Sequence, residues 1–461
     1  MLTYLRAGAT GAPFAVLGEP IPAQTEALTK VAETAQQGLV SGDTGWVLTS
    51  AALVLMMTPA LALFYGGFVR GRNVLNTMMM SLITMAVVSV TWVLFGYSLA
   101  FAPGNAFIGG LQWAGMSDWS VFSAAHDYIS GSLPHYGNGT LNHYAYALFQ
   151  CTFAIITPAL ISGAIVERVT FKAWFWFMLL WSTFIYLPLV HMVWGVDGFL
   201  GLNGSIKALD FAGGLVVEIA SGVSAAVAAW VIGPRRSFAQ KQMSPPHNVV
   251  FILLGAGLLW FGWFGFNGGS ALASGASAGL ASVTTNVCGA TAALVWSLIE
   301  WKERGNPTAV GLATGAVAGL VGITPCAGFV TPLAAIAIGA LVAIACYYAV
   351  ELKSKWRFDD SLDVMPVHGI AGTVGMLLLG LFASKQVYPA GADGLFYGHP
   401  EQFLRQLAAV AFVYLFVGVG TFAILKILGR FMRLRLSENR ETQGLDINAH
   451  GEEAYNSEFS I

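Results

Sequence analysis

The sequence predicts an all-α polytopic membrane protein, and three observations carry that prediction. Of the 461 residues, 56% are hydrophobic and only 10% are charged, against roughly 25% charged residues in an ordinary soluble domain. Apolar runs of about 20 residues, long enough to cross a bilayer as a helix, recur along nearly the whole chain. The 54 glycines suit helices that pack closely in a membrane. A soluble protein is excluded, and the net charge of −2 gives no reason to expect a nucleic-acid partner.

We expect eleven transmembrane helices, one for each apolar run. The runs cover residues 44–68, 76–101, 142–166, 173–194, 211–233, 247–267, 276–300, 308–324, 330–352, 364–383 and 405–431. They divide the chain into an external N-terminal segment (1–42), a membrane domain (43–436) and a cytoplasmic tail (437–461). Whether residues 1–40 are cleaved stays open, because the early apolar stretch is a poor signal peptide.

The basic residues set the expected orientation. Of the 22 lysines and arginines, five fall on one side of this arrangement, which leaves seventeen on the other; the five are Arg6, Lys30, Lys207, Lys385 and Arg405. Because Lys and Arg concentrate in cytoplasmic loops, the N-terminus is expected outside and the C-terminus in the cytoplasm. The first five spans then run opposite to the next five. An inverted repeat of this kind places a substrate site near the middle of the membrane.

Glu218 is the residue that most needs an explanation. It is the only formally charged residue between Phe211 and Ile232. A charge at mid-membrane costs about 2.5–3.5 kcal/mol on insertion scales and usually marks a pathway or a paired site. The best candidate partner is His368, because the strings VEIASG (217–222) and VHGIAG (367–372) look like degenerate copies. The alternatives are a glutamate that merely joins two helices by a hydrogen bond, and two residues that never meet.

The remaining histidines and cysteines give no sign of a metal site or a disulfide framework. His126, His135 and His143 lie in or beside the longest external loop, 102–142, and their spacing fits no tight ligand motif. We expect them to be solvated. The four cysteines have no paired spacing and are expected to be small core residues; they are Cys151, Cys288, Cys326 and Cys346.

Several strings, in order along the chain, resemble the ammonium transporter family, the Amt/Mep/Rh superfamily, in its Amt/Mep branch. They are ALFYGG (62–67), ALFQCTFA (147–154), LVHMVWG (189–195), LDFAGGLVV (209–217), GWFGFNGGS (262–270), DDSLDVMPVHG (359–369) and GLDINAHGEEAYN (444–456). The likeness runs from about residue 43 to 456. It implies a homotrimer in the cell (inner or plasma) membrane, with a pore for ammonium or ammonia in each subunit and no cofactor.

The resemblance also implies roles for five residues of the outer pore. Phe149, Trp194 and Ser270 correspond to an outer recruitment site, and Phe153 and Phe266 to a stacked phenyl gate below it. The chemistry agrees, because aromatic ring faces attract a desolvated cation by roughly 2 kcal/mol. For any one of these rings the plain alternative is packing in the core or against lipid.

Four further positions match the family pattern with weaker implications. Asp210 matches a carboxylate at the start of the fifth span, which we interpret as a helix N-cap and site organiser rather than a ligand. Gln150 and Trp263 match pore-adjacent positions for which packing is the expected role. His191 lies at an outer helix end and is expected to be structural.

The sequence departs from the family pattern where it matters most. The usual pore carries two adjacent histidines; His368 matches the second, and Glu218 replaces the first, as in a minority of relatives that includes some fungal transporters. One hypothesis is that the two residues together accept the proton when ammonium is stripped to ammonia and pass it inward. A rival hypothesis is that anionic Glu218 stabilises ammonium itself, which predicts weaker discrimination against potassium.

Other functions remain open at this point. An ammonium sensor would signal through the tail, which is short for a signalling domain. An intramembrane zinc enzyme would need a third protein ligand beside Glu218 and His368, and none lies on these spans at a helical spacing. A carbon dioxide channel, suggested by the Rh branch, fits the motifs less well, so we expect a transporter and no enzyme. In prokaryotic relatives, the tail packs on the neighbouring subunit and a PII-type protein plugs the cytoplasmic exits.

Overall fold

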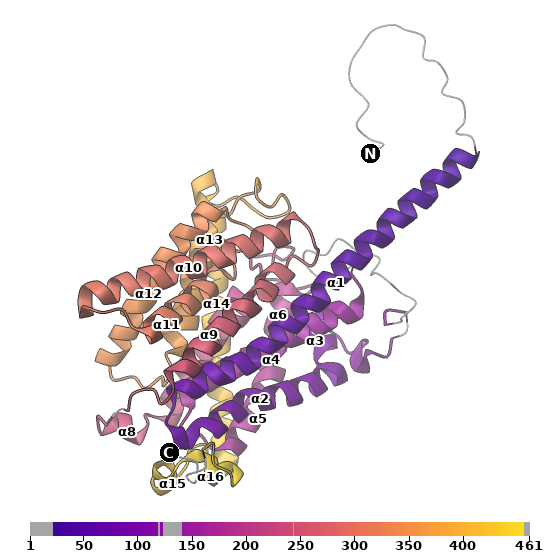
Figure 1. Ribbon diagram of the computed structural model, residues 1–461. Helices are drawn as coiled ribbons and strands as arrows, with labels where there is room; N and C mark the ends of the chain where they lie inside the picture. Colours follow the sequence, from indigo (N-terminus) through magenta and orange to yellow (C-terminus); the bar gives the residue numbers. More distant parts are fainter. Residues whose placement is uncertain (1–21, 119, 123–140, 243, 456–461) are drawn as a thin grey trace.

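The computed structural model describes residues 22–118, 120–122, 141–242 and 244–455, and this part of the chain is helical (Figure 1). Its only β pairing consists of two isolated bridges, Gly104–Gly109 and Val169–Arg435. The α-helices are α1 (Pro22–Phe68), α2 (Val74–Thr91), α3 (Tyr97–Phe101), α4 (His143–Ile165), α5 (Phe171–Trp181), α6 (Leu187–Trp194), α7 (Ala220–Ile232), α8 (Arg236–Ala239), α9 (Val249–Trp263), α10 (Ala276–Arg304), α11 (Ala309–Ile323), α12 (Pro332–Lys355), α13 (Ala371–Phe382), α14 (Pro400–Phe431), α15 (Glu438–Gln443) and α16 (Leu445–His450).

Among the described residues, ten helices are long and apolar enough to cross a membrane. The eighth expected span is the 15-residue helix α11, which is shorter than these ten, so a count of eleven stays a prediction. Five of the spans contain a π-helical segment: η2 (Trp92–Gly96), η4 (Ser182–Tyr186), η5 (Gly214–Ile219), η6 (Phe264–Gly268) and η7 (Met365–Ile370). The expected boundary at residues 42 and 43 falls inside α1, which is continuous from Pro22.

Side-chain caps start five of the helices. Asn142 caps α4, Thr170 caps α5, Asn248 caps α9, Thr308 caps α11 and Thr331 caps α12, each accepting a hydrogen bond from a backbone N–H in the first turn. A cap satisfies a donor that the helix itself leaves unpaired, which matters most where little water is available. The start of each of these spans is therefore encoded locally.

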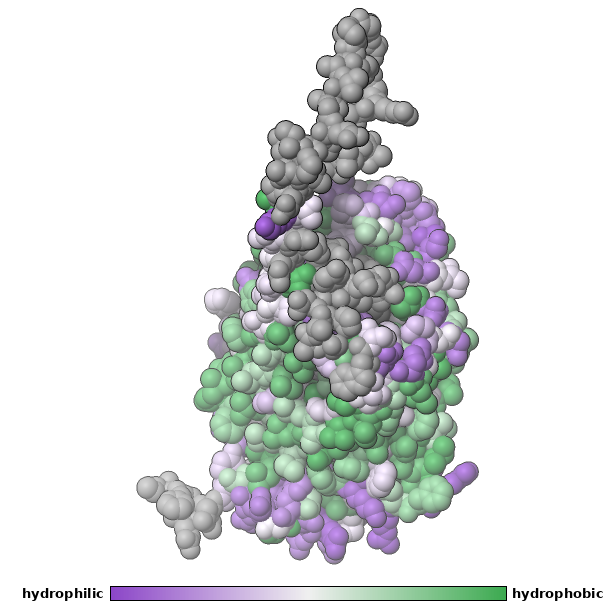
Figure 2. Space-filling model, turned by 90° about the vertical axis from the view of Figure 1, so that its right-hand side faces the viewer, coloured by the Kyte–Doolittle hydropathy of each residue, from purple (hydrophilic) through white to green (hydrophobic). Residues whose placement is uncertain are grey.

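The helices form one bundle with an apolar belt. Figure 2 shows hydrophobic side chains around the middle of the molecule and hydrophilic ones at both ends. Helix α4 lies at the centre, with 94% of its apolar window buried, whereas only 28% is buried in the span that contains α2 and 33% in α14. Since large apolar side chains such as Trp230 and Leu415 are exposed within the belt, the belt suits a lipid environment.

The two ends of the bundle differ. One end, which we call the tail face, is formed by residues 69–73 with the short helix η1 (Gly71–Asn73), by α8, and by α15 and α16 (Figure 1). The opposite end, the loop face, carries residues 102–118, 195–213 and 383–399; there the Gly104 N–H donates to Asp197 at 3.0 Å. The N-terminal part of α1 extends away from the bundle beyond the loop face (Figure 1).

Candidate functional site

Two π-helical segments, η5 and η7, hold the site residues at mid-bundle. Each begins just after a buried aspartate. The carboxylate of Asp210 accepts hydrogen bonds from three N–H groups at the start of η5, Gly213 at 2.8 Å, Gly214 at 2.7 Å and Leu215 at 2.8 Å. This is the geometry of a helix cap. The hydrogen bonds of the Asp210 carboxylate therefore match the interpretation of this residue as a helix cap.

Asp360 does the same for η7. Its two carboxylate oxygens accept from the N–H groups of Val364 at 3.1 Å and Met365 at 2.7 Å. Glu218 follows Asp210 by eight residues, and His368 follows Asp360 by eight. The two halves of the chain therefore present their titratable residues from matching, carboxylate-capped segments.

The same correspondence continues one turn further. Gly222 lies four residues after Glu218, and a side chain there would collide with the backbone of Gly369. Gly372 lies four residues after His368, and a Cβ there would be 2.8 Å from the Cβ of Glu218. Each segment thus lets the other approach at backbone distance, because a glycine replaces the side chain that would keep them apart.

Glu218 and His368 meet. The Oε2 atom of Glu218 lies 2.7 Å from Nδ1 of His368, and the two side chains are 1% and 5% exposed. If the carboxyl is ionised, the imidazole N–H donates to it; if the carboxyl is protonated, its O–H donates to the imidazole. In both cases one proton lies between the two residues and joins them by a hydrogen bond.

A narrow cavity lies beside the pair. It is lined by Glu218, His368 and apolar or aromatic side chains from α1, α4, η5, α9, η6 and α11: Met57, Leu61, Phe64, Ile156, Leu160, Val217, Leu259, Trp263, Phe266 and Val317. Its volume is about 10 Å³, which is close to the least space that holds one water molecule. The passage is therefore nearly closed and almost wholly apolar apart from the pair.

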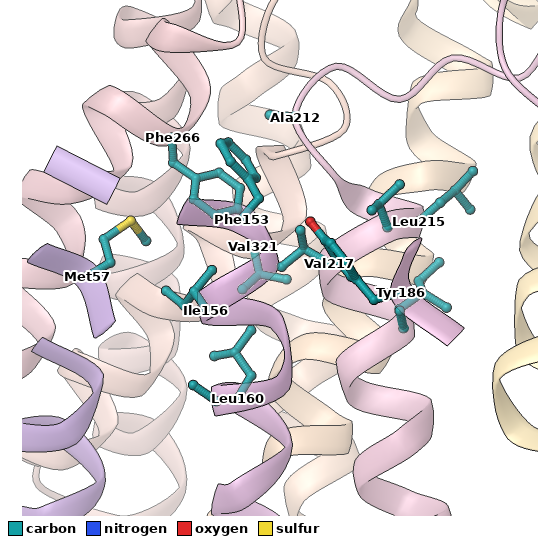
Figure 3. Packing of buried hydrophobic residues seen from close by; sticks show 14 of the residues in the cluster. Met57, Phe153, Ile156, Leu160, Tyr186, Ala212, Leu215, Val217, Phe266 and Val321 are labelled. Carbon is teal, nitrogen blue, oxygen red and sulfur yellow. The ribbon is translucent and has the colours of Figure 1, made fainter. Parts of the chain in front are cut away.

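Two stacked phenyl rings lie above this cavity. The rings of Phe153 and Phe266 are 4.4 Å apart between centroids and tilted by 44°, and they lie next to each other in Figure 3. Phe149 packs edge-on against Phe153 at 4.9 Å, and Trp194 does so at 6.1 Å. Phe149 and Phe153 are one turn apart on α4. The contact between Phe153 and Phe266 therefore joins α4 to η6, in the other half of the chain.

The residues expected at the outer site are only partly brought together. Phe149 and Trp194 both contact Phe153, and the indole N–H of Trp194 donates to the carbonyl of Asp210 at 3.1 Å. Ser270 is 8% exposed and its hydroxyl donates to the carbonyl of Phe266 at 2.7 Å. Its link to the rings is indirect, through the neighbouring Gly269, which packs against Phe149.

The chain is similar to known proteins over most of its length. The model of the Ammonium Transporter Family matches residues 45–455 of the chain. The chain belongs to the ammonium transporter family. An ammonium transporter of Bacillus subtilis is 48% identical over 415 residues, which cover 90% of this chain and 98% of the relative. An ammonium transporter of Aquifex aeolicus is 44% identical over 428 residues, 91% of this chain and 94% of the relative.

Solved structures agree with this family membership. The crystal structure of Saccharomyces cerevisiae Mep2 is 34% identical, covers 91% of this chain and 92% of its own, and has a TM-score of 0.80. A Sensor Amt Protein is 26% identical, covers 89% of this chain and 99% of its own, and has a TM-score of 0.78. This family member thus shares its fold with transporters and with a sensor, and its more similar curated relatives are the transporters.

Of the residues with weaker expectations, Trp263 faces the site. Trp263 lines the cavity and donates its indole N–H to Thr324 at 2.9 Å. Gln150 is buried on α4. His191 is fully buried, with Nδ1 3.0 Å from the carbonyl of Ala100 and Nε2 2.8 Å from that of Asn105, so it joins α6 to the loop face.

One expectation about the histidines was wrong. His143 is not a solvated loop residue: it is the first residue of α4, is buried, and its Nδ1 lies 2.9 Å from the hydroxyl of Tyr97. Aromatic rings of Trp113 and Phe122 enclose it. His126 and His135 lie outside the described residues. Within the described part of the family member, no group of three or more His, Cys, Asp or Glu side chains could hold a metal ion.

A buried ion-pair network closes the tail face. Arg235 pairs with Asp359 at 2.7 Å and with Glu167 at 3.1 Å, and Glu167 also pairs with Arg70 at 2.8 Å. Burial alone would raise the pKa of Glu167, but Arg235 and Arg70 outweigh it and lower that pKa to about 2. Arg168, fully buried beside them, has its pKa lowered to about 10 by burial.

The tail docks on its own chain. The carboxylate of Asp446 accepts from the N–H groups of Leu75 at 3.1 Å and Asn76 at 2.8 Å, which caps the start of α2. The carboxylate of Glu441 accepts from the N–H of Arg236 at 2.7 Å and pairs with Arg435 at 2.7 Å. Sequence reasoning missed these contacts, because acidic residues in a polar tail carry no local sign of what they cap.

Proposed function

We propose that the protein transports ammonium across a membrane through the passage lined by Glu218 and His368. The observation that carries the proposal is the buried pair itself, an acid and a base 2.7 Å apart behind the stacked rings of Phe153 and Phe266. Burying a titratable pair deep in an apolar passage costs free energy, and such pairs usually mark the path of an ion or a proton.

The proposed path starts at the loop face. Ammonium is recruited against the rings of Phe149 and Trp194, with Ser270 beside them, and loses part of its water there, since aromatic rings stabilise a desolvated cation. The stack of Phe153 and Phe266 then excludes hydrated ions. The contacts that support this order are the edge-on packing of Phe149 and Trp194 on Phe153.

At the pair, ammonium gives up one proton and continues as ammonia. The proton goes to the hydrogen-bonded unit of Glu218 and His368, so one N–H bond breaks and one O–H or N–H bond forms on the protein. The unit then releases the proton toward the tail face, where ammonium can form again. Glu218 stands, in this proposal, where most of the family has a histidine, and Asp210 holds η5 in place by its three backbone contacts.

The assembly belongs to the same proposal. We place the protein in a plasma membrane as a homotrimer with the loop face outside and the tail face in the cytoplasm, with a five-plus-five inverted repeat and a PII-type protein as partner. The matching caps and glycines around Glu218 and His368 support the repeat. Exposed apolar side chains on α10 and α12, such as Leu294 and Leu333, support contact with lipid or with other subunits.

Currents on a solid-supported membrane test the proposal. Proteoliposomes with wild-type protein should give a current on an ammonium pulse and little on a potassium pulse. Glu218→Ala should abolish the ammonium current. Glu218→Gln keeps the shape and a hydrogen bond but cannot hold the negative charge, and it should lose most of the current too.

The outcomes separate the competing ideas. A wild-type protein that binds ammonium but passes no current would refute the proposed transport of ammonia together with its proton. A Glu218→Gln variant with full ammonium current and unchanged potassium exclusion would leave transport standing and remove the pair from the proton path. A Glu218→Gln variant that loses ammonium current while potassium discrimination improves would favour an anionic Glu218 that holds ammonium itself.

A further inference from the structure

A second pocket opens on the tail face, well away from the passage. Its volume is about 730 Å³, which is in the range of small-molecule sites, roughly 300–1,000 Å³. Three segments far apart in the sequence line it: residues 70–72 after α1, α8 with the loop that follows it, and α15 of the tail. A ligand in this pocket would touch all three.

Arginines dominate the charge of the pocket. Arg70, Arg72 and Arg236 line it, and Glu441 is the one acidic residue among the described lining residues. Glu441 is 2% exposed and is already engaged by the Arg236 N–H and by Arg435, each at 2.7 Å. Its charge is therefore largely balanced from outside the pocket.

The arginines keep donors available. Arg72 forms no hydrogen bond or ion pair with any other described residue. Arg70 uses its Nε atom on Glu167 at 2.8 Å. Arg236 pairs with Glu438 at 3.3 Å, but the side chain of Glu438 is 80% exposed, and surface pairs of this kind contribute only about 0–1 kcal/mol. A stronger anion would displace Glu438 readily.

Hydroxyl and amide groups complete the lining. Ser237 on α8 and Thr442 and Gln443 on α15 supply neutral donors beside the guanidinium groups. Basic residues are common in the cytoplasmic loops of membrane proteins, so their presence alone does not indicate a binding site. Three guanidinium groups that converge on one polar cavity are more specific, because the planar guanidinium matches phosphate oxygens in pairs.

We propose that this pocket binds a phosphate-bearing ligand with two or more negative charges, either a free phosphorylated compound or the headgroup of a phosphorylated lipid. The ligand bridges Arg72 and Arg236 and contacts the tail through α15. Bound there, it holds the tail against the loops that follow α1 and α7. The site is distinct from the passage, so the proposal does not depend on what the passage carries.

Binding measurements on the purified full chain test this site with two arms. In the soluble arm, isothermal titration calorimetry uses sodium pyrophosphate and ATP as probes. In the lipid arm, native mass spectrometry uses phosphatidylinositol 4-phosphate, with phosphatidylcholine as the neutral reference. Binding in the first arm alone assigns a free phosphorylated compound, and binding in the second alone assigns a lipid headgroup.

Variants show whether the binding is at this pocket. The double variant Arg72→Gln/Arg236→Gln should bind at least about tenfold more weakly, because two charge-assisted contacts are lost. The matched control Lys302→Gln/Arg357→Gln removes two positive charges from other segments and should bind within about twofold of wild type. If the double variant does not yield monodisperse protein, Arg72→Gln alone serves, since the Arg72 guanidinium has no hydrogen-bond or ion-pair partner among the described residues. No binding of any phosphate probe at low millimolar concentration, or equal loss in the control pair, overturns the proposal.

Discussion

At the scale of single residues, the site consists of side chains that each have a specific contact in the structure. Glu218 and His368 are hydrogen-bonded at 2.7 Å, Asp210 accepts three backbone donors, and the rings of Phe153 and Phe266 lie 4.4 Å apart. Each of these groups is almost without access to water. Small chemical changes there should therefore have effects that one measurement can resolve.

The phenyl stack gives the first prediction. Phe266→Leu keeps an apolar side chain but removes the ring that faces Phe153, so hydrated cations should pass more easily. We expect the potassium current of proteoliposomes to rise relative to the ammonium current. Leu is smaller than Phe, so some stability should be lost as well, as in other large-to-small changes in a core. Phe177→Leu, at a buried ring on α5 outside the passage, is the control and should leave the current ratio unchanged; a rise there too would mean that the effect is general loosening.

Asp210 gives the second prediction. Asp210→Ala leaves three buried N–H groups at the start of η5 without their acceptor. Each unsatisfied buried donor costs about 1–3 kcal/mol, so the thermal unfolding midpoint should fall clearly in detergent, as followed by tryptophan fluorescence. Asp210→Asn retains one acceptor oxygen and should fall between wild type and alanine. An unchanged midpoint for alanine would show that water replaces the carboxylate.

At the scale of elements, the crossing of the two site segments is the decisive contact. Gly222 lies against Gly369, and Gly372 against Glu218 and Ile219. The crossing fixes how far apart the backbones under Glu218 and His368 can be. It explains why the pair meets without a long side chain reaching across.

A prediction follows for the glycine at the crossing. Gly222→Ala adds a Cβ that collides with backbone atoms of Gly369, so the segments must separate. We expect less folded protein, a lower thermal midpoint and loss of the ammonium current. The loss of stability should be typical of overpacking, about 1–3 kcal/mol. Gly279→Ala on α10 is the matched control, because nothing lies within 4 Å of the added Cβ; it should be neutral or slightly stabilising. Equal effects of the two changes would contradict the close crossing.

At the scale of the whole molecule, the tail face ties distant parts of the chain together. Glu167, Arg235 and Asp359 come from three different connections between helices, and the tail adds Asp446 and Glu441. Removing one member of a buried ion pair leaves the other uncompensated. Global stability should therefore respond to the protonation of this network.

The pH dependence has a definite sign. The pKa of Glu167 is about 2 in the folded protein and 4.5 when unperturbed, so its ionised form stabilises the fold above about pH 4.5 and that contribution is lost as the pH falls toward 2. The thermal midpoint should drop across this window. In Glu167→Gln the drop should be shallower, from a midpoint already lower at pH 7. A variant with the wild-type slope would show that other carboxylates control acid unfolding.

Much of the fold could be predicted because the bilayer imposes its length on the sequence. Apolar runs located the spans, and Glu218 and His368 stood out because titratable residues are rare inside such runs. The runs mark membrane depth rather than helix ends, so α1 continues to Pro22 well before its apolar part begins. The capping role of Asp360 and the enclosure of His143 depend on tertiary contacts, and no local pattern distinguished them from ordinary polar residues.

The π-helical segments have a consequence for how the site can change. A π-turn contains one residue more than the α-turn it replaces, and such insertions concentrate at functional sites. η5 begins directly after its aspartate cap and includes the glutamate, so deleting a single residue such as Val216 would let the segment relax to an α-helix. Because the wider π-turn already absorbs the extra residue, the helix beyond it would keep its phase relative to the cap. A one-residue deletion within α7, which has no π-turn to absorb it, would instead turn everything beyond it by about 100°. The extra residue of η5 is therefore slack in the chain length between the aspartate and the end of the segment.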